Sequence, residues 1–115
     1  MSAIRTSRSK AANGHEEYSI HTAKPSFVAK AGKILQSRFG CSTLSKPIVG
    51  PDEIVTDCKK DGVNLLIGWD NWSGFYIMAN SPDGDRLGIR IGDYFDSIKD
   101  DAKLSKYFEN PQHSP

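Results

Sequence analysis

A chain of 115 residues is long enough for one domain with a core of its own. It has no apolar run near the ~20 residues of a membrane span and no hydrophobic signal segment at its start, so we expect a cytoplasmic protein without membrane contact. Two cysteines, Cys41 and Cys58, are too few for a disulfide framework. Two reduced thiols are expected, with a single bridge between them as the alternative.

The net charge of +1 conceals two regions of opposite sign. Residues 1–46 hold eight Lys and Arg against two Glu, a balance of +6, whereas residues 47–115 hold seven against twelve Asp and Glu, a balance of −5. A basic leading part on an acidic body predicts an arm that seeks polyanions or lies on its own domain. The alternative is a solvated tail that keeps the protein in solution.

Residues 1–24 show neither helical nor strand periodicity, and Ser, Ala, Asn, Gly and charged residues dominate them. We therefore expect a basic, flexible tail there, with at most a short extended piece near its end. The predicted domain covers residues 25–110, and residues 111–115 are expected to form a C-terminal tail.

Residues 26–39 carry the signs of an amphipathic helix at both ends. Ser26 can cap the first turn, and Gly40 suits the left-handed position after the last turn. Between these ends, apolar residues recur at the spacing of one helix face, at Phe27, Ala31, Ile34, Leu35 and Phe39.

Residues 51–61 are predicted to form a second helix. Pro51 suits its first position, since the N–H that proline lacks would have no partner there. Acidic residues in the first turn and lysines in the last match the helix dipole, and Gly62 is expected to end the helix.

Three strands are expected over residues 63–70, 75–80 and 86–91, as an antiparallel meander. Apolar residues alternate in each strand, which builds one face that the helices must cover. The second connection, residues 81–85, has the proline and glycine of a turn. The opposite face is mixed in composition, so it is solvated, partly covered or a binding surface.

The end of the chain, residues 93–108, is predicted to be a third helix with a break near Asp100–Asp101. The predicted fold is α+β, in the order α-α-β-β-β-α, with a three-stranded sheet packed on three helices. Its α-β-β-β-α part, residues 51–108, resembles the double-stranded RNA-binding domain in topology. That family begins its last helix with a lysine cluster, whereas residues 92–97 here are acidic, so the resemblance implies no RNA binding.

The acidic second half and Trp72, in the turn after the first predicted strand, favour a non-enzymatic protein-binding module. An exposed tryptophan is a common anchor of protein recognition, and carboxylates steer a basic partner toward it. In size and class the chain is similar to toxin-neutralising immunity proteins, so an immunity-type or regulatory adaptor fits. The alternative for the tryptophan is a ring folded back over the sheet edge. The predicted partner-binding residues are Asp70, Trp72, Asp96, Asp100 and Asp101.

Nucleic-acid binding is the alternative function. A basic arm supplies charge against phosphates, and aromatic and arginine side chains on an open sheet face can hold single strands. The alternative is an amphipathic outer face in which these arginines pair with Asp or Glu and bind no nucleic acid. The residues of this alternative are Arg5, Arg8 and Lys10 in the arm and Tyr76, Arg86 and Arg90 on the sheet.

The sequence contains no catalytic, metal-binding or cofactor motif. Its three histidines fall in the tail and at the end of the chain, which leaves no histidine in the predicted body for a triad or a metal site. Glycine-rich phosphate loops are absent as well. A third class of function is a small-molecule site or small enzyme with an apolar pocket between sheet and helices. The third predicted strand has an open edge that can pair across a homodimer.

Overall fold

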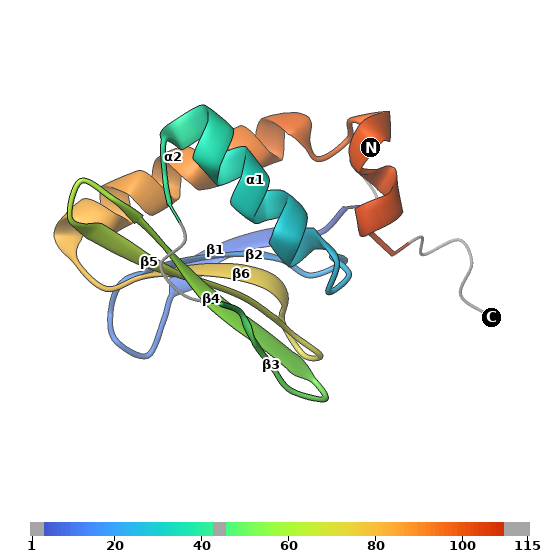
Figure 1. Cartoon of the computed structure of the whole chain (residues 1–115), viewed down its shortest axis with the longest axis horizontal. Coiled ribbons are helices and arrows are strands. Elements are labelled where there is room, and N and C mark those ends of the chain that lie inside the picture. Colours follow the sequence, from blue (N-terminus) through green and yellow to red (C-terminus); the bar gives the residue numbers. More distant parts are fainter. Residues whose placement is uncertain (1–3, 43–45, 110–115) are drawn as a thin grey trace.

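A six-stranded antiparallel sheet carries the helices of the protein on one of its faces (Figure 1). The computed structural model describes residues 4–42 and 46–109. The strands lie side by side in the order β1-β2-β6-β5-β4-β3. In chain order the elements are β1 Thr6–Lys10, β2 Glu16–Ile20, α1 Phe27–Phe39, β3 Ile48–Val49, β4 Glu53–Lys60, β5 Val63–Asp70, β6 Gly74–Ala79, α2 Pro82–Ile98 and the 3₁₀ helix η1 Ala102–Tyr107.

The α+β class, the helix at residues 26–39 and the first two predicted strands are confirmed. β5 and β6 pair antiparallel, with Ile67 opposite Ile77, and both side chains are fully buried under the helices. Alternation predicts this well, because each strand has one face in the core and the other outside it. Gly40 closes α1 in the left-handed conformation, at φ 70°.

The helix predicted over residues 51–61 is wrong, because residues 53–60 form strand β4. Residues 51 and 52 belong to the bend that precedes the strand, and the eight residues of β4 pair with the eight of β5. Thr56 and Cys58 are buried, while Lys59 is exposed. This period of two outweighs the charges that match a helix dipole, because the strand gains a full ladder of hydrogen bonds.

Residues 86–91 lie in helix α2, so the third predicted strand is wrong, and the sheet edges are β1 and β3 instead. Ser81 caps the helix, since its Oγ accepts a hydrogen bond of 3.0 Å from the backbone N–H of Gly84. Leu87, Ile91 and Phe95 then follow at intervals of four and make a buried stripe. The predicted turn is therefore the start of a helix, with proline in its first position.

The first 24 residues are not a tail in the structure, because they contribute strands β1 and β2. β2 pairs with β6, and this register places Tyr18 opposite Ile77 and Ile20 opposite Phe75. Both β2 side chains are buried in the core. The β1–β2 hairpin, β4 and the short β3 add four strands to the two that were predicted correctly, so the sheet has six strands.

The predicted break in the last helix is present. α2 ends at Ile98, and η1 begins at Ala102 after Asp101, whose side chain accepts a hydrogen bond from the backbone N–H of Lys103. Leu104 is buried, so the final turns pack on the core. The predicted C-terminal tail, residues 111–115, lies outside the described residues.

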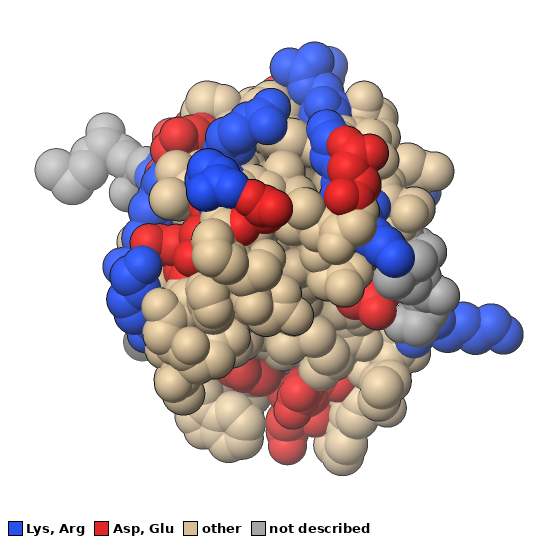
Figure 2. All heavy atoms as spheres, turned by 90° about the vertical axis from the view of Figure 1, so that its left-hand side faces the viewer, with Lys and Arg blue, Asp and Glu red and all other residues tan. Residues whose placement is uncertain are grey.

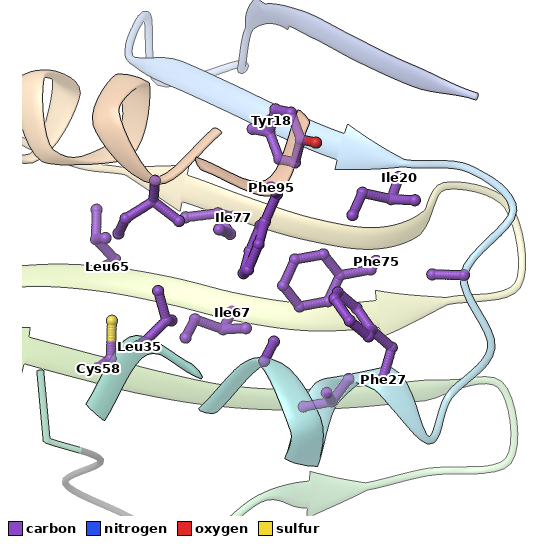
Figure 3. Close-up of a cluster of buried hydrophobic side chains, with 14 of the residues drawn as sticks. Tyr18, Ile20, Phe27, Leu35, Cys58, Leu65, Ile67, Phe75, Ile77 and Phe95 are labelled. Atoms are coloured by element: carbon purple, nitrogen blue, oxygen red, sulfur yellow. The ribbon is translucent and has the colours of Figure 1, made fainter. Parts of the chain in front are cut away.

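Aromatic side chains from both helices and the sheet form the centre of the core (Figure 3). The ring centroid of Phe27 on α1 lies 4.9 Å from that of Phe75 on β6 and 5.7 Å from that of Phe95 on α2. Phe75 and Phe95 are 5.8 Å apart in an edge-on arrangement. All three rings are fully buried, and edge-to-face pairs at these separations add to the stabilisation from burial.

Candidate functional site

Within residues 4–42 and 46–109, the helices cover one face of the sheet and leave the other uncovered, since both α1 and α2 pack on the same side (Figure 1). Side chains in register with the buried Ile67 and Ile77 point to the helices, and their neighbours along each strand point away. We call the second surface the outer face. Its members on the four middle strands include Glu17, Ser19, Glu53, Val55, Asp57, Leu66, Gly68, Asp70, Tyr76 and Met78.

The strand register arranges the outer face in rows with an apolar centre. In one row, Met78 on β6 and Leu66 on β5 lie opposite each other, and the flanking partners are Glu17 on β2 and Asp57 on β4. Leu66 is 39% exposed, which is high for a leucine on a sheet. Met78 and Leu66 therefore each have a carboxylate beside them on the next strand, Glu17 on β2 and Asp57 on β4.

Tyr76 forms the middle of the next row and is 7% exposed, although none of the helices in the described residues covers it. Its ring lies over Gly68 of β5, and a Cβ atom at Gly68 would meet the ring itself and come within 2.7 Å of the carbonyl oxygen of Ile54. The missing side chain at Gly68 is thus what allows the tyrosine to lie across the sheet. The ring is therefore packed against the sheet and largely buried, although it belongs to the outer face.

Carboxylates surround Tyr76. Burial raises the pKa of Tyr76, and the negative charges of Glu53, Asp70 and Glu17 raise it further. Lys59 is on the same face, at a corner opposite Asn64. At the lower edge of Figure 2, where the outer face is seen from the side, carboxylates stand among uncharged side chains and no basic group is visible. The centre of the outer face is therefore apolar and negatively charged.

Asp70 and Trp72, two of the predicted partner-binding residues, are held together at one end of the sheet. Asp70 Oδ1 accepts hydrogen bonds from the backbone N–H groups of Trp72, at 2.9 Å, and of Ser73. The N–H of Asn71 donates to the carbonyl oxygen of Asp52 in the preceding turn, which ties the two turns together. Trp72 is 81% exposed, so its ring is not folded over the sheet edge.

The other predicted partner-binding residues lie elsewhere. Asp96 belongs to α2 and points to β1 and β2, where it accepts hydrogen bonds from Arg8 and Tyr18. Asp100 and Asp101 follow the end of α2, and Asp101 caps η1. The structure therefore brings Asp70 and Trp72 together but places these three aspartates in the helical layer.

The basic residues of the nucleic-acid alternative are not gathered on one surface. Within β1, Arg8 forms ion pairs of 2.8 Å with Asp93 and Asp96, and Lys10 forms one of 2.7 Å with Glu16. Arg5 directly precedes this strand, and its carbonyl oxygen accepts a hydrogen bond from the N–H of His21.

Arg86 and Arg90 lie on α2, in the layer opposite the outer face that carries Tyr76. Arg86 pairs with Asp83 one turn earlier in the same helix. The guanidinium of Arg90 lies 6.0 Å from the ring centroid of Phe39 on α1. Arg90 therefore supports the contact between α1 and α2, Arg86 pairs within its own helix, and neither arginine adjoins Tyr76.

Three acidic residues of the outer face were absent from the sequence-based site. Glu17 fell in the predicted tail, and Glu53 and Asp57 fell in the predicted helix of residues 51–61. The alternation of buried and accessible side chains in β4 is the signal that could have located the last two. Nothing local marks Glu17, because its neighbours on the outer face come from β6.

Comparisons with known proteins assign no family to this chain. The chain matches no family model, and searches of the curated proteins and of the solved structures returned no match. Among residues 4–42 and 46–109, no three His, Cys, Asp or Glu side chains gather as metal ligands would. In the same residues, no helix is long and apolar enough to cross a membrane.

Proposed function

We propose that this protein is a non-enzymatic protein-binding module whose outer face docks on a basic partner. The observation that carries the proposal is the row of the outer face in which Met78 and the 39% exposed Leu66 lie between the carboxylates of Glu17 and Asp57, beside the largely buried Tyr76. Covering an apolar surface of this kind with a partner lowers the free energy of the system. The surrounding negative charge selects for a partner with basic side chains.

Trp72 extends this surface at one end of the sheet. Its ring is exposed, and the hydrogen bonds of Asp70 to the turn fix the backbone that presents it. A rigid, exposed tryptophan binds with little loss of conformational freedom, which is why tryptophans are frequent energetic anchors in interfaces. An immunity-type or regulatory adaptor would use the surface in this way, with the aromatic ring as anchor and the carboxylates for steering.

The test compares two lysine substitutions at equally exposed positions. Leu66 on the outer face is 39% exposed and Ile89 on α2 is 41% exposed, so Leu66→Lys and Ile89→Lys alter similar environments on opposite layers. The full-length protein and both variants are used as bait in a native lysate, with and without nuclease, and retained proteins are quantified by mass spectrometry. Retained proteins are then purified and their affinities measured directly.

The proposal expects a basic protein that is retained by the wild type and by Ile89→Lys and is lost with Leu66→Lys. Its affinity should fall with added salt, since charge contributes to the association, and Trp72→Ala should weaken it by roughly tenfold or more. Equal retention by both lysine variants would exclude the outer face as the docking surface. Loss of all retained material after nuclease treatment would favour nucleic-acid binding instead.

A further inference from the structure

A groove of about 490 Å³ separates α1 from the β3–β4 end of the sheet. It lies on the helix side of the sheet, because Val49 and Ile54 are in register with Trp69 on the covered face. Its wall on α1 includes Val28 and Gly32, and Pro25 adds to it just before the helix. A groove of this size is within the range of about 300–1,000 Å³ that is typical of small-molecule sites.

Gly32 leaves the space open in the middle of α1. A Cβ atom built there meets no other atom within 4 Å, so a larger side chain would enter the groove without displacing the core. Glycine inside a helix lowers its stability relative to alanine. The chain thus has a residue that is unfavourable for the helix at the position where a side chain would fill the groove.

The lining has an apolar body and one positive charge. Among the described residues that line it, Lys33 carries the only charge, and no carboxylate is present. Gln36, Ser26 and Thr56 add groups that can form hydrogen bonds. An apolar wall excludes strongly polar ligands, and a cation at the rim favours an anionic group at the end of an apolar chain.

We propose that this groove binds an amphipathic carboxylate with a medium-length alkyl chain. The groove follows α1 from Val28 to Gln36, a distance of ~12 Å along the helix axis, and continues past the start of the helix to Pro25. The alkyl chain lies against Val28, Gly32 and Ile54, and its carboxylate pairs with Lys33. This site is on the opposite side of the sheet from the outer face, so it goes beyond the protein-docking role and can be tested without the partner.

The experiment is calorimetric titration of the full-length protein with dodecanoate below its micelle threshold. Four variants accompany the wild type. Gly32→Leu places an isobutyl group in the middle of the groove, whereas Gly32→Ala adds only a methyl group at the same position. Lys33→Gln removes the charge at the rim, and Lys30→Gln removes a charge from the same helix outside the lining. Each variant is first checked for cooperative thermal unfolding, and dodecanol replaces dodecanoate in a parallel titration.

We expect one dodecanoate per chain in the wild type, in Gly32→Ala and in Lys30→Gln. Binding of both dodecanoate and dodecanol should be lost in folded Gly32→Leu. Lys33→Gln should weaken dodecanoate by about three- to fivefold, the size of one partly exposed charge pair, and leave dodecanol unchanged. Absence of dodecanoate binding to the wild type, or undiminished binding to Gly32→Leu, would overturn the proposal. An equal effect of Lys30→Gln and Lys33→Gln would overturn the assigned role of Lys33.

Discussion

The hydroxyl of Tyr18 on β2 donates a hydrogen bond of 2.8 Å to Oδ1 of Asp96 on α2. The other oxygen of Asp96 accepts a hydrogen bond of 2.8 Å from Nη2 of Arg8 on β1, and the Arg8 guanidinium lies 5.6 Å from the centroid of the Tyr18 ring. One carboxylate thus joins the N-terminal hairpin to the second helix. Three of the residues expected in the tail or on a partner-binding surface serve the fold in this way.

Asp96→Asn should lower stability at neutral pH and weaken the acid sensitivity of the protein. Burial raises the pKa of Asp96, but the hydrogen bonds from Arg8 and Tyr18 outweigh it and hold the pKa below the ordinary value of 3.8. A carboxyl with a lowered pKa in the folded state stabilises the protein above its unfolded pKa, and this stabilisation is lost as pH falls through the folded pKa. We expect a loss of about 1–2 kcal/mol at pH ~7 and a smaller loss near pH ~3.

Urea unfolding of the wild type and Asp96→Asn at both pH values measures this difference. Asp93→Asn is the control, because Asp93 also pairs with Arg8 but its side chain is 66% exposed and therefore screened by solvent. A constant difference between the wild type and Asp96→Asn at both pH values would show that the ionised carboxylate does not carry the contact.

Two glycines on successive turns of α2 should respond in opposite directions to alanine. A Cβ atom at Gly92 would lie 2.9 Å from Cδ1 of the buried Tyr18 ring, whereas a Cβ atom at Gly88 meets nothing within 4 Å. Gly88→Ala should therefore stabilise the protein by up to about 1 kcal/mol through helix propensity. Gly92→Ala should destabilise it by about 1–3 kcal/mol, because the core around Tyr18 has to shift. Denaturant unfolding of both variants decides this, and a gain of stability in Gly92→Ala would contradict the packing of α2 on β2.

The strands at 63–70 and 75–80 were predictable because their signals are local. Every second residue in each strand is strongly apolar, as in Leu65 and Ile67 or Phe75 and Ile77, and the turn between the strands is short enough to fix the pairing. The same reasoning could have found β4. Asp61 and Gly62 form the two-residue turn between β4 and β5, both with positive φ, at 50° and 81°. An Asp-Gly pair between alternating segments is a strong hairpin signal, but it was interpreted as the end of a helix.

The helix at 82–98 was missed because its apolar residues fit two periods. Leu87, Ile89 and Ile91 alternate as in a strand, whereas Leu87, Ile91 and Phe95 are spaced as on a helix. The structure follows the second pattern, and Ile89 is left 41% exposed. Serine followed by proline is a helix start, and this signal favours the second pattern as well.

The assembly of the outer face could not be read from the sequence in the same way. Asp70 and Trp72 are neighbours in one turn, so their proximity was predictable. Glu17 meets Met78 only through the pairing of β2 with β6, which are far apart in the chain. Such pairings depend on how the whole sheet closes over its core, and a strand with only two buried apolar side chains, Tyr18 and Ile20, gives little sign of them.

Deleting residues 1–24 should unfold the protein, and not merely remove a charged arm. Tyr18, Ile20 and Ala23 are at most 4% exposed, and β2 supplies the ladder that pairs with β6. Loss of these buried side chains would cost several kcal/mol, a large share of the roughly 5–15 kcal/mol of a typical domain. Far-ultraviolet circular dichroism and thermal melting measure the outcome. A folded, cooperative deletion variant would contradict the placement of the hairpin.

The contribution of the basic side chains of the β1–β2 hairpin to nucleic-acid binding is better tested with the hairpin intact. Arg5→Gln with Lys10→Gln removes two exposed charges from the ends of β1 and leaves the buried β2 side chains in place. We expect a melting temperature close to that of the wild type, since surface substitutions usually change stability by no more than about 0.5 kcal/mol. A difference in nucleic-acid binding between this variant and the wild type then reports charge alone, as does the salt dependence of that binding.

Cys41 and Cys58 should react with a thiol reagent only when the protein opens. Both thiols are buried and free, with exposures of 3% and 1%. Burial, together with the neighbouring Cys41, raises the pKa of Cys58 to about 12, and burial also raises the pKa of Cys41. Since the thiolate is the reactive form, both residues remain protonated and shielded at pH ~8.

Titration with an aromatic disulfide reagent at that pH should give slow labelling of the native protein and rapid labelling of two thiols per chain in urea. Ser37→Cys, at an exposed position on α1, is the matched control and should add one thiol that reacts at once in the native state. The labelling rate of the two native cysteines should rise with urea in step with unfolding, because solvent reaches them only through opening of the core. Rapid labelling of either cysteine in the absence of urea would mean that the contact between the end of α1 and β4 opens on its own.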